Sequence, residues 1–386
     1  AAGLGAAGED GFRTTLTRLM LPDDANPAGN VHGGTILKMM ELSAFIIAAR
    51  HVNGGAGTSA GADRRCVGVV LASIQHCSFL KPMKIGDVAH VRARIIGAHS
   101  SSLEISVKVY RECLGSHDRY VESTHRAQHR GSSSGRGASR LQLTNTSRLW
   151  YVQVSLPPKA GGSGGRMSFQ LAPGLRPLSG LSRDELLAGE ARYKALKSER
   201  AAESLSNSNT YDAARDPTDV VIARLMLPSD CSSGGLVFGG VLSKMMDSGA
   251  GVTCGKHCRS NCVTVSMENF RLLSPTRVGD HVSIRTRIVF TSSRTMEIEA
   301  IATRVDRHSA STDGFIVVCC ARARFIFVAL QGSKVCKMPA WTPKTEYERK
   351  LAAQARQRYV LKKESRAAAK KGAQGSGENR GLIFSY

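Results

Sequence analysis

The sequence predicts an α+β protein built from two tandem copies of one domain, each a long buried helix wrapped by a curved antiparallel sheet. Two observations carry this prediction. The segment AGNVHGGTILKMMELSA at 28–44 returns as GGLVFGGVLSKMMDSGA at 234–250. Segments in which apolar and polar residues alternate, as they do in half-buried strands, follow each copy. A helix followed by consecutive strands gives an α+β domain in which the sheet packs on the helix.

The repeated segments predict helices over 35–51 and 241–257. A helix that is apolar nearly all the way round is enclosed by other structure and does not lie on a surface. The first helix has this character, with apolar residues at Ile36, Leu37, Met39, Met40, Leu42, Ala44, Phe45, Ile46 and Ile47.

The strand pattern is clearest at 87–96 and 280–289, where apolar side chains share one face and arginines the other. The apolar faces consist of Val91, Ala93 and Ile95 in the first copy and of Val282, Ile284 and Ile288 in the second. Further strands are predicted at 101–110, 141–156, 294–302 and 317–330.

Composition shifts divide the chain into domains and connecting segments. Two connecting helices are predicted to open with the spacing of a capping box, at Ser182 with Glu185 and at Thr345 with Glu348. We expect a disordered lead-in over 1–14, an N-terminal domain over 15–158 with a low-complexity insertion over 112–140, a Gly-rich linker plus helix over 159–214, a C-terminal domain over 215–335, and a C-terminal helix with a basic tail over 336–386.

Length and hydropathy indicate a soluble globular protein. The 386 residues give room for about two domains, and the mean hydropathy is −0.16. No apolar run approaches the roughly 18 to 20 residues that a membrane span requires, and the N-terminal residues lack the apolar core of a secretory signal. We therefore expect a cytoplasmic protein, or a mitochondrial matrix protein if the N-terminus is truncated.

The formal charge of +22 favours anionic partners, either nucleic acid or a phosphorylated small ligand. Much of this charge lies in the tail after Trp341 and in the 112–140 insertion. These segments are too irregular to build a specific reading surface, so we expect a solvated surface and no nucleic-acid partner.

Ten cysteines without framework spacing indicate a reducing compartment. Cys254, Cys258 and Cys262, with His257 beside them, form a candidate metal cluster. The first copy has Ala48 where Cys254 stands, and a closed zinc site needs four converging ligands. The sequence alone therefore favours an ordinary helix, and we expect neither a metal nor a separate cofactor.

Candidate chemistry begins with the paired glycines Gly33-Gly34 and Gly239-Gly240, at the predicted N-termini of the two helices. Unpaired backbone N–H groups there can hold an anion or a polarised carbonyl oxygen, although a tight turn before a crowded helix would need the same residues. An acid follows seven residues after each pair, Glu41 or Asp247. Because carboxylates in apolar surroundings are seldom kept without a partner or a task, these acids favour a functional interpretation.

Seven residues are about two turns, so each acid lies ~10 Å along the axis from the amides of its own helix. Two antiparallel helices would bring the amide end of one opposite the carboxylate of the other. This predicts two pseudo-equivalent sites. We expect the first, with its polar loop, to be the working site and the second to be weak or inactive. The first joins Asn30, His32, Gly33 and Gly34 to Asp247; the second joins Leu236, Phe238, Gly239 and Gly240 to Glu41.

The motifs PDDANPAGNVHGGTILKMME and FGGVLSKMMD resemble those of tandem hotdog acyl-CoA thioesterases of the cytosolic long-chain acyl-CoA hydrolase type, over 16–160 and 215–335. The resemblance implies hydrolysis of fatty acyl-CoA to a fatty acid and CoA. Asn30 and Asp247 match the family's catalytic pair. Asp247 would be a general base or a nucleophile, while Asn30 and the Gly-Gly amides would orient water or stabilise the oxyanion. Phe238 departs from the animal enzymes, which have His there.

The resemblance also implies where substrate binds and how chains assemble. Arg294 suits a CoA phosphate because a guanidinium binds it bidentately, although an exposed arginine at a strand start is an equal alternative. Related tandem chains assemble further, so we expect a trimer of chains. Besides His32, Gly33 and Gly34, the implied contacts are Ala72 and Ser73 with Ser101, Ser102 and Leu103, and Thr264, Val265 and Ser266 with Arg294, Thr295 and Met296.

Two other functions remain open at this point. A hotdog dehydratase would pair His32 with Glu41, but neither repeat shows the expected Pro-Gly stretch and the second copy lacks the His. A non-catalytic protein would bind acyl-CoA or nucleic acid through its basic surface. Other repeated polar residues are assigned no catalysis: His51 and His257 end their helices, and Asp24 and Asp230 form turns.

Overall fold

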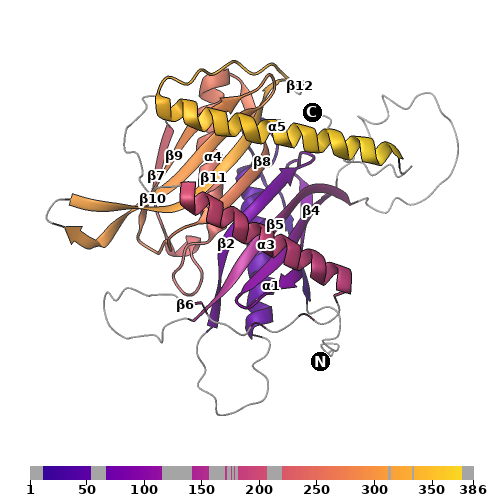
Figure 1. The fold of residues 1–386 in the computed structure, drawn as a ribbon, viewed down its shortest axis with the longest axis vertical. Helices are drawn as coiled ribbons and strands as arrows, with labels where there is room; N and C mark the ends of the chain where they lie inside the picture. Colours follow the sequence, from indigo (N-terminus) through magenta and orange to yellow (C-terminus); the bar gives the residue numbers. More distant parts are fainter. Residues whose placement is uncertain are drawn as a thin grey trace, which may run out of the picture.

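The computed structural model describes residues 12–53, 67–114, 141–155, 170–171, 175, 178, 181–206, 220–311, 314–332 and 334–375. Each half contains one long helix, α1 (Gly33–Asn53) or α4 (Gly239–Cys258), packed against antiparallel strands. The two halves lie side by side (Figure 1). The predicted α+β class, with one buried helix in each of two repeats, is confirmed.

Within the described residues the strands form a single 12-stranded sheet with the central order β1-β3-β4-β5-β2-β8-β11-β10-β9-β7. The two halves join where β2 pairs with β8, from Ser73 opposite Arg271 to Ser78 opposite Ser266. The strands are β1 (Arg13–Leu19), β2 (Val67–Phe79), β3 (Asp87–Ala98), β4 (Ser102–Cys113), β5 (Gln142–Ser155), β7 (Val220–Leu225), β8 (Asn261–Leu272), β9 (His281–Thr291), β10 (Met296–Ser311) and β11 (Gly314–Gln331), with the short β6 (Gln170–Leu171) beside β5 and β12 (Lys334–Val335) beside β11.

The sequence prediction located six of the twelve described strands and omitted β1, β2, β6, β7, β8 and β12. The omission of β2 has a physical cause. Register shifts between Leu71 and Ser73 and between Ile74 and Cys77 interrupt its alternation. The join between the halves was therefore not visible in the pattern.

Helix α1 is enclosed as predicted. Ile47 and Ala48 are fully buried on it, and the helix contacts β1 to β5. The apolar face of β3 points toward this core, since Val91, Ala93 and Ile95 are all at most 2% exposed. The alternation read from the sequence thus assigns the correct face of the sheet.

The two long helices cross at their glycines. A Cβ added to Gly34 would lie 2.6 Å from the Lys244 Cα, and one added to Gly240 would lie 2.8 Å from the Lys38 Cα. Both distances are too short for a side chain, so glycine is required by the close approach of two backbones. Gly34 lies against Lys244, whereas the later residue Lys38 lies against the earlier residue Gly240. The order of contacts is reversed between the two helices, so they are antiparallel.

Two further helices, α3 (Arg183–Ser206) and α5 (Glu346–Gly375), lie across the opposite face of the sheet (Figure 1). Both begin with the predicted capping box. Ser182 N–H donates to Glu185 Oε2 at 3.0 Å, and Glu185 N–H donates to Ser182 Oγ at 3.2 Å. Thr345 and Glu348 make the equivalent bonds at 2.9 Å and 3.1 Å.

One arginine anchors each of these helices to an acid on the sheet. Arg192 Nε lies 2.7 Å from Glu104 Oε1, and Glu104 is fully buried. Arg358 Nη2 lies 2.5 Å from Glu297 Oε1. The duplication therefore extends to the appended helices and to their anchoring ion pairs.

Several predicted segments lie wholly or partly outside the described residues. Of the lead-in 1–14, only residues 12–14 are described, and Arg13 already begins β1. The insertion predicted over 112–140 lies outside from residue 115 on, as do the Gly-rich stretch before 170 and the tail after 375. Among the described helices, none combines the length and the apolar character needed to cross a membrane.

Candidate active site

The helix crossing brings each acid to the N-terminal amides of the opposite helix. Gly34 N–H donates to Asp247 Oδ2 at 2.7 Å. In the mirror arrangement, Gly239 N–H donates to Glu41 Oε1 at 2.8 Å, and Gly240 N–H donates to Glu41 Oε2. The predicted exchange of carboxylates between the two helices is present at both ends of the crossing.

Polar groups surround the Asp247 carboxylate. The Thr264 hydroxyl donates to Asp247 Oδ1 at 2.6 Å. His32 Nδ1 lies 3.4 Å from Asp247 Oδ2 and also accepts the Gly34 N–H at 3.0 Å. On the other side of the ring, His32 Nε2 lies 3.4 Å from Ser248 Oγ. The site combines a carboxylate, an imidazole and two hydroxyls at one helix N-terminus.

Burial shapes the proton affinity of this carboxylate. Asp247 is 2% exposed, and desolvation raises its pKa, against the opposing effects of His32, Thr264 and Gly34. A carboxylate with a raised pKa accepts a proton more readily than an ordinary aspartate does. Asp247 is therefore suited to act as a general base.

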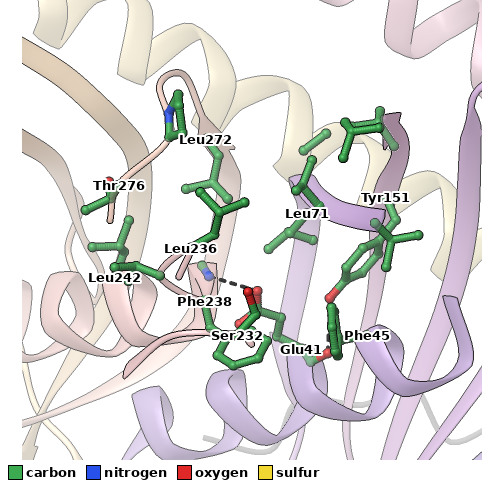
Figure 2. A pocket seen from close by; sticks show the side chains of 18 of the residues that line it. Glu41, Phe45, Leu71, Tyr151, Ser232, Leu236, Phe238, Leu242, Leu272 and Thr276 are labelled. Carbon is green, nitrogen blue, oxygen red and sulfur yellow. Dashed lines mark hydrogen bonds between the residues drawn. The ribbon is translucent and has the colours of Figure 1, made fainter. Parts of the chain in front are cut away.

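The Glu41 site has a different character. A cavity of about 290 Å³ opens beside Glu41. Burial raises the Glu41 pKa to about 7, even though the hydrogen bonds from Gly240 and Gly239 lower it. Figure 2 shows the carboxylate among predominantly apolar side chains. These include Phe45, Leu71, Leu236, Phe238, Leu242 and Leu272.

Asn30 lies in the loop that enters α1. Its backbone N–H donates to Asn26 Oδ1 at 3.1 Å, its carbonyl accepts the Asn26 N–H at 2.7 Å, and its backbone pairs with Lys84. These bonds fix the position of the loop two residues before His32. The catalytic role of the Asn30 side chain stays a prediction.

Three residues predicted to contact CoA come together in the C-terminal half. Val265, Ser266 and Thr295 line one cavity of about 320 Å³ between the sheet and α5. Lys362 and Lys363 of α5 line the same cavity. The grouping supplies positive charge that the sequence prediction had not connected with these residues.

The other predicted contacts are more scattered. Arg294 is exposed in the turn between β9 and β10, whereas Leu103 and Met296 belong to the hydrophobic core. In the N-terminal half, Ser73 Oγ accepts a hydrogen bond from Arg200 Nη2 at 3.0 Å. Ala72 lines the Glu41 cavity, the Ser101 carbonyl accepts the Gln153 N–H, and Ser102 is buried at the start of β4.

Two contacts of the Asp247 site were missed by the sequence prediction. Thr264 was singled out only as a CoA contact, because its approach to Asp247 depends on how β8 follows α4. Ser248 was not singled out at all. A signal for it existed, since the first copy has the apolar Leu42 where Ser248 stands.

The repeated turn residues have structural roles, as predicted. Asp24 Oδ2 accepts the Leu21 N–H at 3.1 Å, and Asp230 Oδ2 accepts the Leu227 N–H at 3.0 Å. An arginine pairs with each, Arg18 with Asp24 in the first repeat. His32 lies against Asp247 while Glu41 lies at the other pair of amides, so in the described part of the chain the His32–Glu41 pair of a dehydratase is not formed.

Comparison of the sequence with known proteins identifies the family of this chain. Residues 28–114 and 234–311 match the family model of the thioesterase superfamily, so fold and site together define a tandem hotdog protein of that superfamily. A cytosolic acyl coenzyme A thioester hydrolase of Mus musculus is 33% identical over 364 residues, which cover 92% of this chain and 84% of that protein. Its namesake from Homo sapiens is 33% identical over 357 residues, covering 90% and 83%. The chain belongs to the cytosolic acyl coenzyme A thioester hydrolase family.

Proposed function

We propose that this protein hydrolyses fatty acyl-CoA thioesters to free fatty acid and CoA at a composite site between α1 and α4. The observation that carries the proposal is the Asp247 carboxylate of one repeat, held 2.7 Å from the Gly34 amide of the other. Membership of the thioester hydrolase family supports the reaction class. Hydrolysis needs a base for water and a positive environment for the oxyanion, and this helix crossing offers both.

In this mechanism Asp247 takes a proton from a water molecule as the water oxygen attacks the thioester carbonyl. Negative charge develops on the carbonyl oxygen, where the N-terminal end of α1 and the Asn30 amide stabilise it. The intermediate then expels the CoA sulfur, and the proton held by Asp247 passes to that thiolate. The alternative is direct attack by Asp247 on the carbonyl, which breaks the C–S bond, releases CoA as its thiolate and leaves an acyl–aspartyl anhydride that water then hydrolyses.

CoA binding is assigned to the cavity under α5. Lys363, and Lys362 once it leaves its ion pair with Glu268, provide cations for the CoA phosphates. Ser266 and Thr295 add polar groups to the same cavity, which Glu297 also lines. Arg294 is exposed and is a second candidate for a phosphate contact. CoA enters as part of the substrate, so the proposed reaction needs no separate cofactor.

A second arrangement has its own supporting observation. The apolar cavity of about 290 Å³ lies beside Glu41, and the Glu41 pKa of about 7 suits a general base near neutral pH. In this version Glu41 is the working acid and its cavity receives the acyl chain. We favour Asp247 because His32, Thr264 and Ser248 surround it with polar groups.

The deciding experiment measures palmitoyl-CoA hydrolysis by two matched amide variants, Asp247→Asn and Glu41→Gln. We expect Asp247→Asn to lose about 10²- to 10⁴-fold in kcat while still binding CoA, and Glu41→Gln to keep most of the activity. A large loss of kcat in Glu41→Gln with little loss in Asp247→Asn would identify the Glu41 site as the active site. Undiminished turnover in both variants would refute the carboxylate mechanism.

Assembly and compartment are further proposals. We propose a homo-oligomer, specifically a trimer of tandem chains, and light scattering of the purified protein measures this directly. The relatives are named cytosolic, so we propose the cytosol as the compartment.

The alternative function, nucleic-acid binding, would appear as an affinity for RNA that falls steeply with salt and does not depend on Asp247.

A further inference from the structure

Three cysteines gather at the end of α4. Cys254 and Cys258 lie one turn apart on the helix, and Cys262 follows in β8. Their Sγ atoms all lie within 4.8 Å of one another, and the Cys254 and Cys258 sulfurs are 3.9 Å apart. The chain reverses between helix and strand at Arg259, whose left-handed backbone (φ 52°) ends the helix. The tight reversal is what brings the third thiol back to the first two.

A fourth sulfur comes from a distant segment of the chain. Met338 Sδ lies 3.2 Å from Cys258 Sγ, and Met338 is 2% exposed. Cys336 lies on the same segment, close enough for its charge to affect Cys258. Three chain segments thus converge on one sulfur cluster, formed by Cys254, Cys258, Cys262 and Met338.

The spacing of this cluster suits metal coordination. Thiolates that share a metal ion with bonds of about 2.3 Å lie roughly 3.8 to 4.0 Å from one another, close to the 3.9 Å between Cys254 and Cys258. The 3.2 Å contact between Met338 and Cys258 is shorter, so the thioether would shift outward when a metal binds. Cys254 is fully buried, while Cys258 and Cys262 are half-buried. The cluster is therefore largely enclosed, with two of its thiols partly accessible to solvent.

We propose that the sulfur cluster binds a thiophilic d¹⁰ metal ion, Cu(I) in preference to Zn(II). Soft thiolate and thioether ligands select such ions, and the thioether of Met338 favours Cu(I). The sequence alone did not favour this site, because the first copy has Ala48 where Cys254 stands and a closed zinc site needs four converging ligands. The site is independent of the proposed hydrolysis.

The location indicates a stabilising role. Cys254 lies seven residues after Asp247 on α4, about 10 Å farther along the axis. A metal ion there joins the end of the helix to β8 and to the segment that carries Met338. The C-terminal end of a helix also favours positive charge. We expect metal binding to raise the melting temperature without entering the chemistry at Asp247.

The test uses the full chain, reduced and stripped of metal under anaerobic conditions. One sample is titrated with Cu(I) against a copper chelator and another with Zn(II) against a zinc indicator. We expect one equivalent of tightly held Cu(I), and a metal coordination shell made only of sulfur in X-ray absorption. Cys258→Ser should weaken binding at least tenfold, and Cys113→Ser, a half-buried cysteine at the end of β4, should leave it unchanged.

Further variants keep the test decisive. Met338→Leu should weaken Cu(I) binding and leave Zn(II) binding unchanged. A control compares the melting temperatures of Cys258→Ser and the parent, both without metal. Equal values show that the variant folds. If Cys258→Ser does not fold, Cys262→Ser takes its place in the titrations. Tight Zn(II) with sulfur ligands but no Cu(I) binding would overturn the copper preference. Failure to bind either ion, nitrogen or oxygen ligands alone, or an equal loss in Cys113→Ser would overturn the site.

Discussion

The two ends of the helix crossing share a backbone arrangement and differ in almost every side chain around it. At one end Asp247 meets the Gly34 amide within reach of Thr264 and His32. At the other end Glu41 accepts both the Gly239 and the Gly240 amides beside an apolar cavity.

This difference distinguishes the residues that the fold requires from the residues that determine the chemistry of each site. Gly34 and Gly240 are needed at the two ends because the backbone of the opposite helix lies too close for a side chain there, while Gly33 and Gly239 face the side chains of Asp247 and Leu71. The surrounding residues are not constrained in this way. Asn30 and His32 at one end therefore correspond to Leu236 and Phe238 at the other, and a duplicated fold can hold one polar site and one apolar site.

The largest effect is expected when the loop before α1 at the Asp247 site receives the apolar residues found at the Glu41 site. The double variant Asn30→Leu with His32→Phe removes the imidazole beside Asp247 and the Asn30 amide that we assign to the oxyanion. We expect kcat for palmitoyl-CoA to fall by about 10³-fold, on the scale of losing an oxyanion donor. The reciprocal variant, Leu236→Asn with Phe238→His, is the control and should retain activity. Parental kcat in the first variant would show that the loop does not matter.

The anchoring ion pairs give the next largest expected effect. Arg192→Ala leaves the fully buried Glu104 without its partner guanidinium, and we expect a loss of about 3 kcal/mol in the free energy of unfolding. Arg358→Ala should cost less, because Arg324 Nε still lies 3.8 Å from Glu297. Urea unfolding of both variants measures the difference. Equal losses would mean that Arg324 does not compensate.

Titration of Glu41 should make stability depend on pH. Below pH 4.5 the side chain is protonated in both the folded and the unfolded chain. Between pH 4.5 and about 7 the unfolded chain ionises while the folded chain keeps the proton. Stability should therefore fall as pH rises through this window, by about 3 kcal/mol.

Glu41→Gln does not titrate, so this part of the pH dependence should disappear. Urea unfolding at a series of pH values compares the variant with the parent. Asp247→Asn serves as a control for the other buried acid, whose pKa is also raised. Parallel stability curves for the parent and Glu41→Gln would contradict the assignment.

The smallest expected effect comes from the hydroxyl beside Asp247. Thr264→Val keeps the shape of the side chain but removes its hydrogen bond, which favours the charged carboxylate. The Asp247 pKa should then rise further, so the acidic limb of the kcat/KM profile moves to higher pH. We expect about a tenfold loss in kcat/KM near neutral pH. An unmoved profile would argue against Asp247 as the base.

Much of this arrangement could be predicted from the sequence. The repeated segments gave both long helices, and the period of two in β3 assigned Val91 and Ile95 to the core. The exchange of Asn30 and His32 for apolar residues predicted that the two sites differ. The strand β2 was missed because its register shifts interrupt the alternation, so the joining of the two halves into one sheet was missed as well.

By itself the sequence determined the duplication, the buried helices and the two acids, because local periodicity and repeat comparison act over short stretches of chain. Only the tertiary structure decided which side chains meet. Thr264 reaches Asp247 through the turn after α4, and Met338 reaches Cys258 from 80 residues away. Such contacts depend on how distant segments pack. Local spacing shows which face of an element is buried, but hydrophobic burial has no direction and does not specify which distant segment covers that face.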